Sequence, residues 1–122
     1  ESYKITSTFN ISIHYSMKIK LITTSTDSQK IAEIIAEKLV SAHLAPCVQI
    51  IPNVCSTFIW QNKLEITDEL LLQVKTIPEN VQHCKTIILE EHNYETPELI
   101  VTEADIISDD YREWFIKNSL DN

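Results

Sequence analysis

One cysteine and one short polar loop carry the side chains best suited to bind a metal. Cys47 would be, as a thiolate, a soft ligand of the kind that Cu(I) and Zn²⁺ prefer. His92 and Glu95 lie on the loop HNYETP and could add an imidazole nitrogen and a carboxylate oxygen. The structural alternatives are a buried strand cysteine and a loop held by hydrogen bonds at a subunit seam. We treat Cys47, His92 and Glu95 as candidate ligands of copper or another divalent metal ion.

Three other side chains are candidates for lining a ligand cleft. Lys75 ends an apolar run, where it could bind an anion or act as a base, or instead form a salt bridge between chains. Tyr94 belongs to the same loop as His92. Trp60 could stack on a ligand, although tryptophan in such a position more often anchors a protein interface.

The sequence offers no recognisable catalytic machinery. It contains no P-loop, no GxGxxG, no HExxH and no CxxC motif. Cys84 falls on an apolar helical stripe and is expected in the core. The sequence therefore predicts a protein that is not an enzyme.

A long β-hairpin must position these residues. Two extended runs, Cys47 to Trp60 and Lys63 to Thr76, flank the pair Gln61-Asn62, and both runs alternate with period two. A strand of 14 residues spans about 46 Å at 3.3 Å per residue, whereas a domain of this size is about 33 Å across. The hairpin is therefore predicted to bend at Pro52, where proline interrupts the ladder, and to overhang its own domain.

The remaining chain alternates strands and helices around this hairpin. Thr26 and Gln29 form a possible capping box for a helix that ends before Pro46, and Ser108 or Asp109 is expected to cap the last helix. In a chain without glycine, Asn53, Asn62 and Asn93 are the candidates for positive φ. Further elements are a strand at 18–24, a helix from Pro78 to about Glu91 and a strand at 98–107.

The order of elements predicts an α+β fold. It is a ferredoxin-like βαββαβ sandwich with an extended central hairpin and a C-terminal helix. Two helices should cover one face of the four-stranded sheet and leave the other open. Ile50, Phe58 and Leu71, assigned to that open face, are apolar enough to indicate a partner.

Charge and composition limit the classes of partner and compartment. The formal net charge of −8 disfavours nucleic acid and anionic membranes, and no apolar run is long enough to span a bilayer. Three cysteines without a CxxC pair favour a reducing compartment, hence the cytoplasm. Residues 1–16 read as a loosely ordered extension before Met17, so that residues 17–122 form one domain; an organelle is the alternative location if residues 1–16 are a targeting remnant.

Several stretches together resemble the CutA divalent-cation-tolerance proteins. The resemblance covers residues 17–120 and implies a ferredoxin-like fold, a tight homotrimer, a likeness to PII signalling proteins and a link to metal tolerance and copper binding. Cys47 matches the cysteine of the family's A-[AP]-C-V stretch. The stretches are ITTSTD at 22–27, KLVSAHLAPCVQIIPNVCSTFIWQNKLE at 38–65, ELLLQVKT at 69–76, HNYETPELI at 92–100 and DDYREWFIKNSL at 109–120.

The chain departs from the family pattern at three points. Asn93 stands where HPYE commonly has proline, and Asn62 stands where glycine often follows the hairpin tryptophan. Some bacterial members have a cysteine at the end of the first strand, where this chain has Thr23 and Thr24. A metal site that requires that cysteine is absent from this chain.

Three functions are consistent with these observations. The first is a homotrimer for metal tolerance, with Cys47, His92 and Glu95 at clefts between subunits. The second is a PII-like sensor that binds an anionic ligand near Lys75, His92, Tyr94 and Glu95. The third is a structural scaffold that presents its trimer to an unidentified protein partner.

Overall fold

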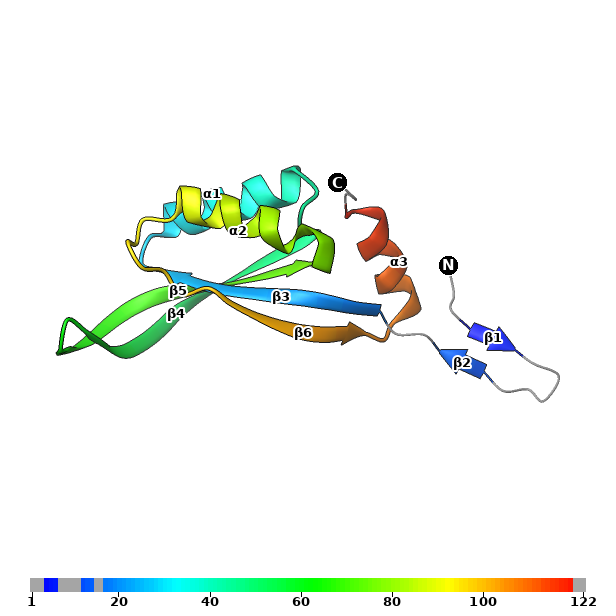
Figure 1. The fold of residues 1–122 in the computed structure, drawn as a ribbon, viewed down its shortest axis with the longest axis horizontal. Coiled ribbons are helices and arrows are strands. Elements are labelled where there is room, and N and C mark those ends of the chain that lie inside the picture. Colours follow the sequence, from blue (N-terminus) through cyan, green and yellow to red (C-terminus); the bar gives the residue numbers. More distant parts are fainter. Residues whose placement is uncertain (1–3, 7–11, 15–16, 120–122) are drawn as a thin grey trace.

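The computed structural model describes residues 4–6, 12–14 and 17–119 (Figure 1). The predicted loose order of residues 1–16 lies largely outside this range, and two short strands within it, β1 and β2, pair antiparallel. The elements are β1 Lys4–Thr6, β2 Ser12–His14, β3 Met17–Thr26, α1 Gln29–Ser41, β4 Cys47–Trp60, β5 Lys63–Thr76, a 3₁₀ turn Pro78–Asn80, α2 Val81–Glu91, β6 Ile100–Ile106 and α3 Asp109–Lys117.

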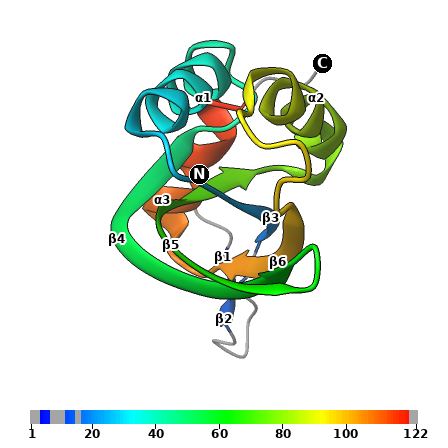
Figure 2. The same cartoon turned by 90° about the vertical axis from the view of Figure 1, so that its left-hand side faces the viewer.

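Four strands form one antiparallel sheet in the order β4-β5-β3-β6. The helices α1 and α2 lie side by side over one face of this sheet (Figure 2). From β3 onward the elements follow one another as βαββαβ with a final helix. The predicted ferredoxin-like α+β fold is therefore confirmed. No helix among the described residues is long and apolar enough to cross a membrane.

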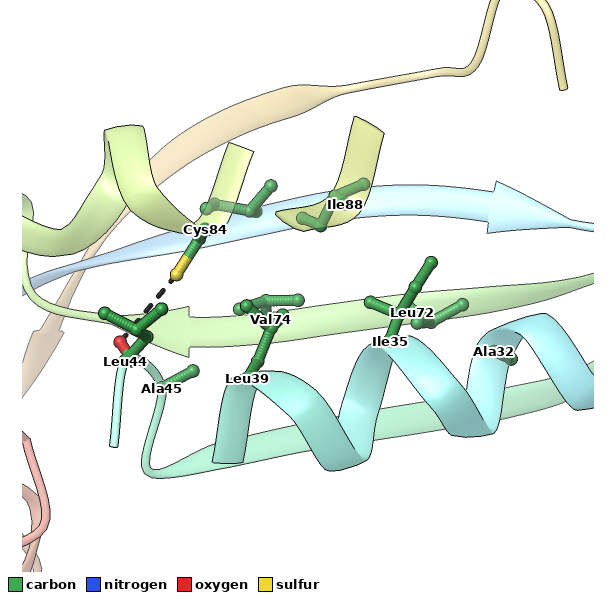
Figure 3. Close-up of a cluster of buried hydrophobic side chains, with 10 residues drawn as sticks. Ala32, Ile35, Leu39, Leu44, Ala45, Leu72, Val74, Cys84 and Ile88 are labelled. Atoms are coloured by element: carbon green, nitrogen blue, oxygen red, sulfur yellow. Dashed lines mark hydrogen bonds between the residues drawn. The ribbon is translucent and has the colours of Figure 1, made fainter. Parts of the chain in front are cut away.

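The main core lies between the sheet and the two helices (Figure 3). Leu72 and Val74 project from β5 toward Leu39 of α1 and Cys84 of α2, and all four side chains are completely buried. The Cys84 thiol lies 3.7 Å from the carbonyl oxygen of Leu44, and burial raises the pKa of that thiol. The prediction that Cys84 belongs to the core is confirmed.

The central hairpin has the predicted ends and turn. Gln61 and Asn62 have φ values of 51° and 65°, as a two-residue type I′ turn requires. The pairing of β4 with β5 shifts between Ile51 and Val54, so the predicted irregularity at Pro52 is confirmed. Beyond it, residues 54–60 and 63–69 pair with each other, and no other strand of the described chain pairs with them. We call residues 54–69 the arm; it overhangs the sheet and curves away from α1 and α2 (Figures 1 and 2).

The bulge changes which face each β4 residue occupies. One extra residue on β4 places Ile50 and Phe58 on opposite faces, although they are eight positions apart. Ile50 pairs with buried Leu72 and packs against the main core, so its assignment to the open face was wrong. Phe58 and Leu71 lie on the other face, as predicted.

Two local predictions at the ends of elements were also wrong. β3 continues through Thr26, and α1 is capped by Ser28, whose hydroxyl accepts a hydrogen bond from the Ile31 amide at 3.2 Å. Positive φ occurs at Asn53 and Asn62 as predicted, but at His43 and Gln61 rather than at Asn93. For α3, the predicted cap Ser108 is confirmed.

The helix α3 covers one end of the face that was expected to be open. Phe115 is buried against Ile19 and Ile106, whereas Ile22, three residues along β3, belongs to the main core on the opposite face. Since side chains alternate along a strand, α3 must pack on the face opposite α1 and α2. Elsewhere on that face some apolar side chains remain exposed, including Ile51 and Ile100.

Candidate functional site

The loop after α2 is fixed to the end of β3 through His92. The backbone N–H of Tyr94 donates to His92 Nδ1 at 3.0 Å, so Nδ1 carries no proton. His92 Nε2 lies 3.0 Å from the carbonyl oxygen of Ser25, which can only accept, and 3.2 Å from Thr24 Oγ1. These contacts assign the neutral tautomer with hydrogen on Nε2. Burial lowers the pKa of His92, in agreement with a neutral ring.

Tyr94 connects the same loop to the hairpin. Its hydroxyl donates to Glu69 Oε2 at 2.6 Å, and Glu69 is only 6% exposed. Burial, and then the hydrogen bond to Glu69, raise the pKa of Tyr94 well above its usual range. Tyr94 is therefore a protonated donor to a buried carboxylate.

Asn93 closes the loop against the start of α1. Its amide nitrogen donates to Asp27 Oδ1 at 2.8 Å, and its amide oxygen accepts from Thr26 Oγ1 at 2.5 Å. Thr26 Oγ1 also accepts from the Ser28 amide at 3.1 Å. The Thr26 hydroxyl is therefore already hydrogen-bonded to the loop and to Ser28, which explains why it does not cap α1.

A cleft of about 950 Å³ lies between the arm and this loop. Phe58 and Trp60 come from the arm, and Tyr94 comes from the loop. Among the described residues, the lining contains five carboxylates but no lysine, arginine or histidine. The lining residues are Ser25, Asp27, Ser56, Thr57, Phe58, Trp60, Glu65, Thr67, Glu69, Asn93, Tyr94, Glu95, Thr96, Pro97 and Glu98.

A smaller cavity of about 340 Å³ adjoins the cleft at the bulge of β4. Pro52 and Asn53 line it together with Asp68, and it shares Asp27 and Glu69 with the larger cleft. Glu69 therefore contributes to the lining of both hollows. Both hollows are acidic.

The candidates Lys75 and Cys47 lie at the other end of the sheet. They pair with each other across β4 and β5, and Lys75 Nζ lies 5.9 Å from the ring centroid of Tyr111 on α3. The β3 partner of Lys75 is Leu21, whereas His92 contacts β3 at residues 24 and 25. The separation along the strand is about 10–13 Å.

The predicted site residues therefore form two groups within one chain. Trp60, Tyr94 and Glu95 line the cleft. His92 is not in the lining and instead holds the loop to β3 by hydrogen bonds. Cys47 and Lys75 are apart from them. Among the described residues, no three His, Cys, Asp or Glu side chains are grouped so that they could hold a metal ion.

Sequence reasoning identified Glu95 but missed the other four carboxylates that give the cleft its charge. Glu65 and Glu69 were recoverable, because they alternate along β5 on the face opposite Leu72 and pair with Phe58 and Val54. Asp27 and Glu98 carried no comparable signal, because they reach the cleft from two loops that meet only in the folded chain.

Comparison with known proteins places the chain in a family. The family model described as CutA1 divalent ion tolerance protein matches residues 20–118. The divalent-cation tolerance protein CutA of Yersinia pestis (strain Pestoides F) is 32% identical over 102 residues, covering 84% of this chain and 85% of the relative.

Solved structures show the same fold over most of the chain. CutA1 of the psychrotrophic bacterium Shewanella sp. SIB1 is 33% identical with a TM-score of 0.81, covering 88% of this chain and 100% of that one. The protein named periplasmic divalent cation tolerance protein CutA, from Archaeoglobus fulgidus, is 28% identical with a TM-score of 0.77, covering 84% and 98%. The family's description names ion tolerance and no reaction. The chain belongs to the CutA1 divalent ion tolerance protein family.

Proposed function

We propose that this protein is a homotrimer that contributes to divalent-cation tolerance by binding the cation, copper among the candidates, between its subunits. The observation that carries the assembly is the composition of the arm. Ile59, Leu64 and Ile66 lie on one face of the arm and are 66%, 67% and 65% exposed. An exposed aliphatic row on an overhanging hairpin is typical of a protein interface. The family resemblance supports three copies.

The separation of the candidate ligands supports a site shared by two copies. Cys47 and Glu95 are far apart within one chain, so a metal bound by both must draw them from different subunits. Both ring nitrogens of His92 are engaged, Nδ1 with the Tyr94 amide of its own loop and Nε2 with the carbonyl oxygen of Ser25 on β3. His92 therefore acts by positioning the Glu95 loop, and it would have to leave that network to bind a metal directly. The proposal includes no catalytic reaction.

Metal titration by calorimetry tests the shared site. Cys47→Ala and Glu95→Gln should each weaken Cu²⁺ uptake at least tenfold in the assembled protein. Cys55→Ala and Glu79→Gln, which alter exposed residues outside the proposed site, serve as matched controls. Equal copper affinity in the wild type and in Cys47→Ala would refute a role for this thiol, whereas loss in the controls as well would indicate non-specific binding.

We place the protein in the cytoplasm, a reducing compartment. Its support is that Cys47, Cys55 and Cys84 are all free thiols. Fractionation of cells that express the full chain, with alkylation of accessible thiols, tests this location. A periplasmic or organellar fraction would contradict it.

Binding of a small molecule is the second candidate function, favoured by the cleft beneath the arm. A volume of about 950 Å³ is suited to a small organic ligand. The anionic ligand expected from sequence would meet five carboxylates here, while Lys75 lies elsewhere. The charge of the lining therefore favours a ligand of the opposite sign.

A further inference from the structure

We propose that the cleft between the arm and residues 93–98 binds a small organic cation, an ammonium group carried on an apolar body. This inference rests on the second candidate function, binding of a small molecule, and names the class of ligand. It is separate from the metal proposal, because it requires the aromatic wall of the cleft and does not require Cys47.

The strongest indication is the buried carboxylate of Glu69. Its side chain lines both cavities and is nine-tenths buried, and its hydrogen bond from the neutral Tyr94 hydroxyl supplies no positive charge. Within the described residues, no lysine, arginine or histidine forms an ion pair with Glu69. A buried charge without an opposite charge is costly. A bound cation would compensate it.

Other carboxylates extend this negative potential across the cleft. Asp27 is held by the Asn93 amide at 2.8 Å, and Glu98 accepts a hydrogen bond from the Ser25 hydroxyl at 3.3 Å. Glu65 enters from the arm and Glu95 from the loop. Concave surfaces lined by charges of one sign concentrate ions of the opposite sign. The cleft should therefore attract cations and exclude anions.

The aromatic wall distinguishes an organic cation from a hydrated metal ion. Phe58 and Trp60 are two residues apart on one face of the arm, and Phe58 pairs across the hairpin with Glu65. Trp60 is 41% exposed and Phe58 39%, so both rings are accessible. An aromatic face attracts an ammonium group and also packs against an apolar body. Hard metal ions instead require several converging oxygen ligands.

Three probes with the same carbon chain test the sign of the preferred charge. In a Trp114→Phe background, Trp60 is the remaining tryptophan and its emission reports on the cleft. With EDTA present, n-butylammonium should shift this emission with a saturable dependence on concentration. The neutral 1-butanol and the anionic butyrate should bind at least tenfold more weakly.

Two variants test the residues on which the argument depends. Glu69→Gln keeps an acceptor for Tyr94 but removes the charge, and it should weaken n-butylammonium binding at least tenfold. Trp60→Leu, measured by calorimetry, should weaken n-butylammonium binding several-fold. Glu79→Gln, on the surface away from the cleft, should leave n-butylammonium binding unchanged. Circular dichroism establishes that each variant is folded.

The results separate this inference from the function on which it rests. If 1-butanol or butyrate binds as tightly as n-butylammonium, the cleft takes small molecules but the cation inference is wrong. If none of the three probes binds, the cation inference and the small-molecule function are both wrong. A neighbouring copy that fills the cleft with its own lysine or arginine would give this result. Equal n-butylammonium affinity in Glu69→Gln and the wild type would also overturn the inference.

Discussion

The hydrogen bonds of His92 give this residue a structural role in a loop that contributes side chains to the cleft. Its Nδ1 accepts from one residue of the loop and its Nε2 donates to the end of β3. Protonation of Nδ1 would place a hydrogen against the Tyr94 N–H and break that contact. The loop should therefore loosen in acid.

We expect a pH-dependent contribution of His92 to stability. The folded state lowers the pKa of His92 below its ordinary value of 6.5, so the unfolded chain takes up the proton more readily. The stability that His92 confers is complete above pH 6.5 and is lost as the pH falls from 6.5 toward the lower folded value. Urea unfolding of the wild type and His92→Gln should show their difference shrinking below pH 6.5. His83→Gln, on an exposed helical surface, is the control; a difference that does not change with pH would contradict the argument.

The Tyr94 hydroxyl should stabilise the fold through Glu69. Tyr94→Phe leaves a buried carboxylate without its donor and should lower the free energy of unfolding by about 1–3 kcal/mol. Tyr111→Phe removes a hydroxyl from an exposed ring and should change it by less than about 0.5 kcal/mol. Denaturant titration of both variants measures these changes. Similar decreases in the free energy of unfolding for the two variants would show that the hydrogen bond to Glu69 does not stabilise the fold.

At this scale the sequence predicted the members of the loop but not their contacts. His92, Tyr94 and Glu95 are close in sequence, so their proximity needed no fold. Glu69 lies 25 positions from Tyr94, and that contact exists because the hairpin returns beside the loop. Likewise, the tautomer of His92 depends on Ser25, which only the tertiary structure brings near.

Among the elements, the bulge of β4 has the largest effect on the shape of the hairpin and on which side chains face the cleft. It places Asn53 at φ 62° and divides the hairpin into a half within the sheet and the arm. By adding one residue, it turns Phe58 and Trp60 toward the cleft. Without that residue they would share a face with Ile50 and lie on the side of the core.

Substitution of Asn53 should show the conformational requirement of the bulge. Asn53→Ala places a β-carbon in the left-handed region and should lower the free energy of unfolding by about 1 kcal/mol. Asn53→Gly removes this steric conflict and should be less destabilising, apart from the larger entropy of glycine in the unfolded chain. Thermal and urea unfolding compare the two; an alanine variant as stable as the glycine variant would contradict the requirement.

Long patterns in the sequence predicted elements better than short ones. The hairpin follows from 28 strand residues with period-two alternation around one turn, and both of its ends were correct. The start of α1 depended on choosing between Thr26 and Ser28, whose residue types are both favoured as helix N-caps. The contact of Thr26 with Asn93 decides that choice, and nothing local in the sequence reveals it.

On the scale of the whole molecule, the arm leaves the chain with an exposed apolar surface. The sequence predicted the overhang from length alone, because a strand pair longer than its domain must extend beyond it. It named Tyr94 and Trp60 as candidates for lining a cleft. It did not predict that one chain forms the cleft by itself, because that depends on the curvature of the arm toward residues 93–98. Curvature arises from twist and bulge geometry that a residue pattern does not specify.

A charge on the aliphatic row of the arm should disrupt assembly. Each chain has a mass of 14.1 kDa, so three chains have a mass of about 42 kDa. Light scattering at micromolar concentration should give the trimer mass for the wild type and the monomer mass for Ile66→Asp. Leu89→Asp, on an exposed surface of α2 away from the arm, should remain a trimer. A wild type that is monomeric would refute the proposed assembly.

The isolation of the arm's ladder has a consequence for isotope exchange. Among the described residues, each strand of the arm has a neighbouring strand on one side only, so alternate backbone amides point outward with no strand carbonyl to receive them. In a free chain these amides should take up deuterium quickly, while those of β3, which lies between β5 and β6, should exchange slowly. Slow exchange of the outward-pointing amides of the arm would then show that the backbone of a neighbouring chain is hydrogen-bonded to them, and would identify each amide involved.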